Sequence, residues 1–156
     1  MRAAIITFPG SNCDRDLLSA LRFTGHETIP IWHKETKLPE NIDLVAIPGG
    51  FSFGDYLRCG AIAAKSPIFQ EVIRHIDRGG YALGICNGFQ ILTEAGILPG
   101  ILQQNIGTKF ISKIIDLRVN NTSSTFTHNY SPNSIISIPI AHHEGNYFAS
   151  RDELKK

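Results

Sequence analysis

A cysteine between two glycines is the residue of this sequence whose setting most clearly points to chemistry. Cys86 lies in the stretch Tyr81–Gln90, with one glycine two positions before it and another two positions after it. This is the Gly-x-nucleophile-x-Gly elbow with cysteine as the nucleophile, in which the glycines let a strand and a helix approach closely and the side chain between them is forced outward. We expect a buried strand over 81–85, a helix from about Asn87, and an exposed thiol at the bend.

The helix that begins after Cys86 is expected to make its thiol more reactive. A cysteine at a helix N-terminus lies at the positive end of the helix dipole, which favours the thiolate that attacks carbonyl carbons. The alternative is a small buried cysteine that happens to lie between glycines. Gly79 and Gly80 before the strand, and an apolar helical face that ends at Gly96, supply the strand-turn-helix context and favour the nucleophile.

An amide-cleaving cysteine also needs N–H groups that face the developing oxyanion. The N–H of Asn87 at the helix start meets this need, and the Gly49-Gly50 loop can bring a second N–H close because it has no side chain in the way. The alternative for Pro48-Gly49-Gly50 is an ordinary turn at the end of a strand.

The whole sequence narrows the class of protein. Its 156 residues are enough for one domain, and a formal charge of +1 creates no field that would gather nucleic acid or an anionic membrane. Three cysteines, at 13, 59 and 86, form neither a disulfide framework nor a metal motif, which favours the reducing cytoplasm. The first apolar run, 3–8, is too short for a signal peptide, and no stretch approaches the roughly 18 apolar residues of a membrane span.

Strand and helix patterns alternate along the first hundred residues and would position the thiol. We predict strands over 3–8, 28–32 and 44–47, a helix over 15–23 capped by Asn12 or Asp14, and a helix opened by Pro67. This alternation predicts an α/β fold with a doubly wound, mostly parallel sheet and flanking helices, so that active groups collect where the strands end. The loops 10–14 and 49–56 and the elbow meet that condition. After residue 105, β-type segments over 110–119 and 134–140 predict a small antiparallel β section, followed by a charged tail over 151–156.

Four motifs together resemble the glutaminase subunits of phosphoribosylformylglycinamidine synthase (PurQ type), which are class I glutamine amidotransferases with a flavodoxin-like fold. They are PGSNCDRD (9–16), IPGGFSFGDYLR (47–58), GICNGFQ (84–90) and PIAHHEGNY (139–147), and the resemblance runs from Met1 to about Tyr147. It implies a single amidotransferase domain over 1–156 that hydrolyses L-glutamine to glutamate. The ammonia would pass to a synthetase partner that converts phosphoribosylformylglycinamide to phosphoribosylformylglycinamidine in de novo purine biosynthesis.

The resemblance also implies roles for single residues and partners. Cys86 would form a γ-glutamyl thioester, and Gly50 and Asn87 would supply the oxyanion amides. The implied substrate-binding positions are Gln90, Gly49, Phe51, Tyr56, Arg58 and His142. Asp55 lies in the same loop as Phe51, Tyr56 and Arg58 and would help to bind the substrate or to dock the synthetase. The expected partners are the synthetase subunit and its small accessory subunit. No metal or cofactor is expected on this chain, which has no glycine-lysine phosphate loop, so ATP and Mg are expected on the synthetase.

One part of the family pattern is missing from the sequence. The family completes its triad with a downstream His-Pro-Glu motif, which residues 1–156 do not contain. Two explanations stay open, a truncated form and a shortened protein that has lost turnover, and we expect the 156-residue chain by itself to be a poor glutaminase. His142 is expected near the site but not as the base, and His143-Glu144 at the surface. The remaining histidines, 26, 33, 75 and 128, are expected to be solvated, Cys59 to pack, and Cys13 and Asp14 to cap or pack at least as readily as to react.

Three other functions compete with this interpretation. A DJ-1/PfpI-like elbow protein would place an acidic side chain against the thiol from an early strand, where this sequence has Pro9-Gly10. A non-catalytic subunit would keep the cradle only to hold glutamine or to dock onto a synthetase. A thiol-redox function is the weakest, because no resolving cysteine neighbours Cys86 in sequence.

Overall fold

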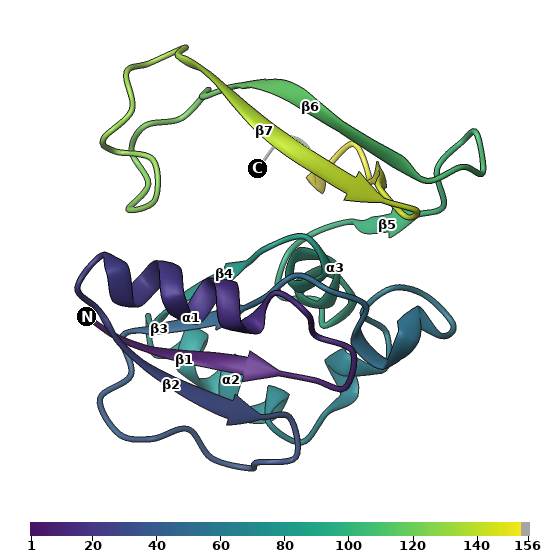
Figure 1. The fold of residues 1–156 in the computed structure, drawn as a ribbon. Helices are drawn as coiled ribbons and strands as arrows, with labels where there is room; N and C mark the ends of the chain where they lie inside the picture. Colours follow the sequence, from purple (N-terminus) through teal and green to yellow (C-terminus); the bar gives the residue numbers. More distant parts are fainter. Residues whose placement is uncertain (154–156) are drawn as a thin grey trace. The chain divides into compact units, whose positions relative to one another are not determined.

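The computed structural model describes residues 1–153 and contains a four-stranded parallel sheet (Figure 1). Its strands are β1 (Arg2–Thr7), β2 (Glu27–Trp32), β3 (Leu44–Ile47) and β4 (Tyr81–Gly84), in the order β2-β1-β3-β4. The predicted mostly parallel sheet is confirmed. The strand order reverses between β1 and β3, and in open α/β sheets ligands bind outside the carboxyl ends of the strands at such a switch point. The loops after β1 and β3 therefore lie at the preferred position for a site.

Helices cover both faces of this sheet, because alternate residues of its strands point to opposite sides. On one face Ala3 and Ile5 pack with Leu17 of α1 (Asp14–Phe23). On the other face, the core contains Ala4, Ile6, Val45 and Ile47 of the sheet, Val72 of α2 (Phe69–Asp77), and Ile91 and Leu92 of α3 (Asn87–Glu94). The predicted doubly wound arrangement is confirmed, and α3 is thereby fixed beneath the elbow. The predicted burial of the elbow strand is wrong, because β4 lies at the edge of the sheet and no residue of β4 is fully buried.

The start of α1 differs from the prediction. The residue at the N-cap is Cys13, and it makes no capping hydrogen bond with its side chain, so neither Asn12 nor Asp14 is the cap. The reason lies in the neighbouring loop, because Cys13 N–H donates to the Gly49 carbonyl over 3.3 Å and Ser11 forms an isolated bridge with Gly50. The turn after β1 is thus used to hold the loop after β3, which contains two short 3₁₀ turns, η1 (Ser52–Asp55) and η2 (Ala63–Lys65).

The residues after α3 divide between two compact units. Met1–Gln104 and the chain from Glu144 onward form the first unit, in which β5 (Ile101–Gln103) pairs antiparallel with β8 (Asn146–Phe148). Asn105–His143 forms the second, a two-stranded antiparallel sheet of β6 (Ile111–Arg118) and β7 (Ile135–His142). The predicted antiparallel section is confirmed, with strand ends shifted by a few residues. A single amidotransferase domain over 1–156 stays a prediction, and residues 154–156 of the charged tail lie outside the described residues.

Two histidines that were expected in solvent are in fact buried. His33 is 7% exposed, packs edge-on against Phe53, and lies 3.4 Å from the Ser66 hydroxyl. Burial lowers the pKa of His33, which favours the neutral ring. His75 is 5% exposed and its Nε2 lies 3.1 Å from the Tyr81 carbonyl oxygen. Both imidazole rings are therefore packed inside the first unit and are not in solvent. Within residues 1–153 none of the helices is both long enough and apolar enough to cross a membrane.

Candidate active site

The backbone at Cys86 has the strained geometry of a nucleophile elbow. Its φ of 53° and ψ of −110° put a residue with a side chain in a region that such residues rarely occupy, at a cost of about 1–3 kcal/mol. β4 ends at Gly84 and α3 begins at Asn87, so the reversal takes place over two residues. The Cys86 side chain is exposed, as predicted. Strain of this kind persists only where the surroundings hold it, which points to the residues packed around the bend.

Two glycines make this reversal possible by close approach. A Cβ at Gly88 would collide with the carbonyl oxygen of Ile47, and a Cβ at Gly84 would lie 2.6 Å from the carbonyl oxygen of Gly88. Strand β3, strand β4 and the first turn of α3 are therefore packed backbone to backbone. The predicted role of the two elbow glycines is confirmed.

The two amides predicted for the oxyanion lie at the sulfur. The backbone N–H groups of Asn87 and Gly50 hydrogen-bond the Cys86 sulfur, and each lowers its pKa. The Gly49-Gly50 segment lies against the elbow, since a Cβ at Gly49 would lie 3.4 Å from the Cβ of Cys86. Two N–H donors that converge on a nucleophile can stabilise the oxygen of a tetrahedral intermediate formed there. That role for Gly50 and Asn87 remains a proposal.

The prediction that Cys86 favours the thiolate is wrong, because the opposing effects on its pKa add up to a raised value. Burial raises the pKa of Cys86 above its ordinary value, and the nearby groups of Cys13 and Asp55 raise it further. The amides of Asn87 and Gly50 offset only part of this cost. Desolvation of a charged sulfur thus outweighs the helix start. Cys13 itself is close by, because its Sγ would lie 3.7 Å from the same Gly49 Cβ.

This raised pKa predicts a steep pH dependence for alkylation of Cys86. Only the thiolate reacts with iodoacetamide, and a thiol whose pKa lies above its ordinary value is mostly protonated at neutral pH. The rate of Cys86 alkylation should therefore rise about tenfold per pH unit from pH ~6.5 to pH ~8.5, as followed by mass spectrometry of the peptide. A rate that levels off below pH ~7 would instead show a thiolate already formed by the helix N-terminus.

A buried asparagine links the elbow to the loop after β3. Asn87 is 2% exposed; its Oδ1 accepts the N–H of Ser52 over 3.1 Å, and its Nδ2 donates to Asp55 over 3.3 Å and to Gln90 over 2.9 Å. Gln90 in turn donates to the backbone oxygen of Glu144 over 2.9 Å. Burial raises the pKa of the Asp55 carboxyl, against the hydrogen bonds from Cys59 and Asn87 that lower it. The loop, the elbow helix and the segment at 144 are thus one hydrogen-bonded cluster.

Glu144 was expected at the surface, and that prediction is wrong. Its side chain is partly buried, and its carboxylate accepts the N–H of Cys59 over 2.9 Å. Cys59 is buried, as predicted, and burial together with the nearby Asp55 raises the pKa of its thiol far above the ordinary value. His143 is exposed, as predicted. Glu144 lies within the motif PIAHHEGNY, but only the fold shows its partner.

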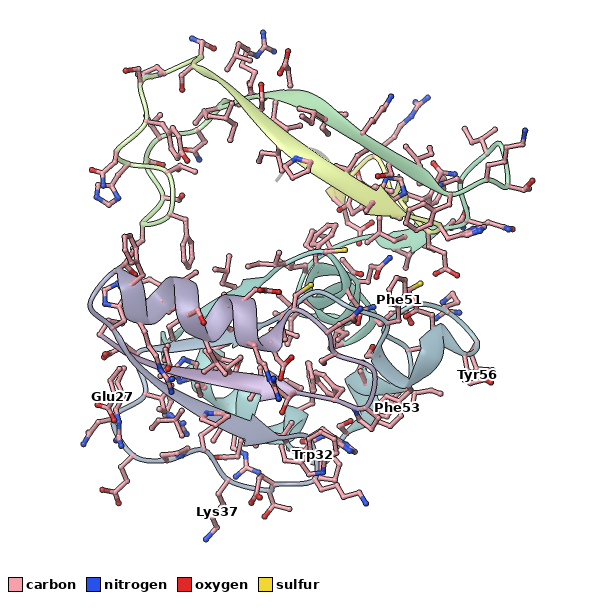
Figure 2. The ribbon with its side chains drawn as sticks, viewed as in Figure 1. Glu27, Trp32, Lys37, Phe51, Phe53 and Tyr56 are labelled. Carbon is pink, nitrogen blue, oxygen red and sulfur yellow. The ribbon has the colours of Figure 1, made fainter. Side chains whose placement is uncertain are left out.

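The other predicted substrate residues lie in different settings. Figure 2 shows Phe51, Phe53 and Tyr56 on the loop after β3, and Phe51 and Tyr56 are 50% and 73% exposed. Arg58 is bonded to Glu94 of α3 through two nitrogens, at 2.9 and 2.6 Å. Their roles stay predictions.

His142 belongs to the second unit. Its Nδ1 lies 3.0 Å from the side-chain oxygen of Asn105, and Asn105 donates to the His142 carbonyl over 3.1 Å. The placement of His142 near the thiol stays a prediction.

Comparisons with known proteins identify the family of this chain. Residues 1–156 match the model of the CobB/CobQ-like glutamine amidotransferase domain. The phosphoribosylformylglycinamidine synthase subunit PurQ of Cereibacter sphaeroides is 58% identical over 156 residues, which are 100% of this chain and 70% of that protein. A chain in the structure of PurLQS from Thermotoga maritima is 46% identical with a TM-score of 0.91, over 97% of this chain and 70% of that one.

A more distant structure shares the fold alone. A glutamine amidotransferase from Thermotoga maritima is 18% identical with a TM-score of 0.64, over 97% of this chain and 64% of that one. The family model and the PurQ relatives match the whole chain in sequence, and they therefore show the family as well as the fold. The chain therefore belongs to the CobB/CobQ-like glutamine amidotransferase family, as a member of its PurQ type.

Proposed function

We propose that this chain is the glutamine-hydrolysing subunit of a phosphoribosylformylglycinamidine synthase. The observation that carries the proposal is the exposed Cys86 thiol at the elbow, with the amides of Gly50 and Asn87 on its sulfur. This arrangement suits attack on a carboxamide, because the same amides can receive the negative oxygen that forms. The likeness to PurQ proteins supports glutamine as the amide.

The proposed reaction proceeds through a thioester. The Cys86 sulfur attacks the γ-carbonyl carbon of glutamine, and the oxyanion accepts hydrogen bonds from Gly50 and Asn87. Each such donor typically contributes about 10²–10³ in turnover. Collapse of the intermediate breaks the C–N bond and releases ammonia once the nitrogen is protonated, and water then hydrolyses the thioester to glutamate. The residues proposed to line or border the glutamine site are Gln90, Gly49, Phe51, Tyr56 and Arg58.

The proposal includes the partners of the reaction. The solved relative is named PurLQS, and the curated relatives are named as subunits, so we place a synthetase subunit and a small accessory subunit beside this chain. ATP and Mg belong to the synthetase in this proposal, which uses the ammonia to form phosphoribosylformylglycinamidine. A reducing cytoplasm suits a free thiol nucleophile and stays the predicted location.

Residues 1–156 do not contain the histidine that the family resemblance implies as the general base. The His-Pro-Glu motif of the family is absent from these residues, and the relatives named above are longer than this chain. A thiol with a raised pKa depends strongly on a base, because most of it is protonated at neutral pH. We therefore propose that the 156-residue chain, by itself, hydrolyses glutamine poorly.

A chimera tests both the function and the missing base. A segment that contains the family's His-Pro-Glu motif is fused after Lys156, and ammonia release from glutamine is measured with and without the synthetase. General acid–base catalysis contributes about 10²–10⁴ in rate, so the chimera should exceed the 156-residue chain by about that factor. A fused segment whose His-Pro-Glu histidine is replaced by alanine is the control.

The possible results of this experiment separate the explanations. Equal activity of the chimera and the 156-residue chain would contradict the missing-base explanation and make His142 the candidate base. A chimera that folds, binds the synthetase and still releases no ammonia would favour a docking subunit without turnover. The DJ-1/PfpI-like alternative is not favoured, since the whole chain matches an amidotransferase family.

A further inference from the structure

We propose that the side chain of Asn87 is a positioning residue, which fixes the loop carrying the Gly50 amide against the elbow helix. The backbone N–H of Asn87 already lies at the sulfur, but its buried side chain has a separate task. The catalytic consequence rests on the proposed function, whereas the effect on the loop is independent of it.

The amide side chain of Asn87 uses both its acceptor and its donor. The Oδ1 holds the N–H of Ser52 and the Nδ2 holds the carboxylate of Asp55, at distances of 3.1 and 3.3 Å. Ser52 and Asp55 are the first and last residues of η1, so one side chain ties both ends of this turn. A carboxylate of the same shape could accept from Ser52 but could not donate to Asp55. An asparagine is therefore the chemistry that this position requires.

The segment that Asn87 holds is strained and needs such support. Phe53, Asp55 and Leu57 have φ values of 54°, 56° and 71°, in the left-handed region that favours glycine. Each residue of this kind costs of order 1 kcal/mol or more and persists only where neighbouring groups over-determine it. The loop would leave this conformation if its anchors on α3 were removed.

The opposite side of the loop is fixed to the turn after β1. Phe51 N–H donates to the Gly10 carbonyl over 2.9 Å, and Phe53 N–H donates to the Pro9 carbonyl over 2.7 Å. Gly50 lies close against this turn, since a Cβ added to Gly50 would lie 2.6 Å from Asn12 Oδ1. The Gly50 amide is thus placed by the turn on one side and by Asn87 on the other. A loop released from Asn87 would carry this amide away from the sulfur.

The cluster beyond Asn87 strengthens the same attachment. Gln90 accepts from Asn87 and donates to the Glu144 backbone, and the Glu144 carboxylate accepts the N–H of Cys59. The residues from Ser52 to Cys59 are therefore bonded to α3 at four points, three of them direct, at Ser52, Asp55 and Arg58, and the fourth from Cys59 through Glu144. Asn87 is the residue of α3 whose side chain bonds to both ends of η1 and to Gln90, so its substitution disturbs the most bonds.

The test compares two labelling reactions at Cys86 in the full 156-residue chain. Diazo-oxo-norleucine is a glutamine analogue whose carbonyl oxygen needs the oxyanion amides, whereas iodoacetamide reports the thiol alone. In Asn87→Asp the maximal rate with the analogue, divided by the iodoacetamide rate, should fall by about 10²-fold, the effect of losing one oxyanion donor. The half-saturating concentration of the analogue should stay within about threefold, because the substituted group does not contact it.

A double substitution tests whether the hydrogen bond between positions 87 and 55 is the cause of the effect. In Asn87→Asp combined with Asp55→Asn, the new amide at 55 can donate to the new carboxylate at 87, which restores the bond with reversed direction. We expect about a tenfold recovery of the labelling ratio over the single variant, in the range of the coupling energies of bonded pairs. Asn41→Asp is the matched control: Asn41 is exposed, the charge change is the same, and the ratio should not change.

Hydrogen exchange of the loop provides a measurement that needs no substrate. Amides of residues 52–56 should exchange at least about tenfold faster in Asn87→Asp than in the wild type, since their anchor is lost. Asp55→Ala, which leaves the buried residue intact, should speed the same exchange if Asn87→Asp does not fold.

The outcomes distinguish this proposal from the proposed function. A wild-type chain that iodoacetamide labels and the analogue does not would contradict the proposed function, while exchange would still report on Asn87. A labelled wild type with unchanged labelling ratio and unchanged exchange in Asn87→Asp would overturn the positioning role alone. Failure of the double variant to recover any labelling, with both variants folded, would overturn the specific bond between Asn87 and Asp55.

Discussion

Replacement of Cys86 by alanine is expected to abolish covalent labelling by diazo-oxo-norleucine, and to lower glutamine hydrolysis by the chimera about 10⁴-fold or more. In the proposed mechanism the Cys86 thiol forms the covalent bond, and the Gly50 and Asn87 amides at its sulfur cannot replace it. Removal of a nucleophile that acts together with its base costs about 10⁶ in the best-studied triads, with a residual rate from the oxyanion donors. Mass spectrometry of the labelled peptide and an ammonia assay measure the two effects.

The other cysteines are the matched controls for this result. Cys13 is exposed and its sulfur lies near the same Gly49 segment, whereas Cys59 is buried and bonded to acidic neighbours. Cys13→Ala should leave the analogue labelling within about threefold, because Cys13 is not at an elbow and has no predicted oxyanion donors. Analogue found on Cys13 in the Cys86→Ala variant, at the wild-type rate, would assign the reaction to the wrong sulfur and contradict the proposed site.

The elbow could be predicted from the sequence because its determinants are local. The two glycines of the pattern lie within two residues of Cys86, although the close approach that Gly88 allows is to Ile47 of β3, and the alternation of strands and helices places three loops at one edge of the sheet. The same geometry predicted N–H donors at the helix start and in the Gly49-Gly50 loop, whereas the choice of Gly50 within that loop came from the family resemblance. These parts depend on chain geometry rather than on side-chain packing.

The parts that the sequence could not predict depend on burial and on distant partners. Neither His33 nor Glu144 carries a local signal for its burial, because each has a polar partner more than thirty residues away along the chain, Ser66 for His33 and Cys59 for Glu144. The same holds for the pKa of Cys86, where the desolvation that raises it depends on the assembled site. Cys13 lies close to Cys86 although the two are far apart in sequence. The spacing of residues within one motif does not predict contacts between residues that are far apart in the sequence.

Replacement of Gly88 by alanine is expected to destabilise the first unit severely. The added methyl group would collide with the carbonyl oxygen of Ile47, which already accepts the N–H of Ile85 over 3.0 Å. Neither atom can move freely, because both belong to the packed backbones of β3 and α3. Forcing a methyl group into a close-packed site typically costs about 1–3 kcal/mol and here should reach about 3 kcal/mol or more. Urea unfolding measures this loss, and the melting temperature should fall by about 10 °C.

Gly25→Ala separates this steric effect from the backbone effect of losing a glycine. Gly25 has a φ of +82° and no atom within 4 Å of its added Cβ, so only the conformational cost of about 1 kcal/mol applies. Gly88 is helical and has no such cost, so its larger loss must come from the collision with Ile47. Equal losses in the two variants would contradict the close approach of α3 to β3. Because that approach also turns the Cys86 side chain outward, any folded Gly88→Ala protein should label more slowly with diazo-oxo-norleucine, whereas folded Gly25→Ala should label at the wild-type rate.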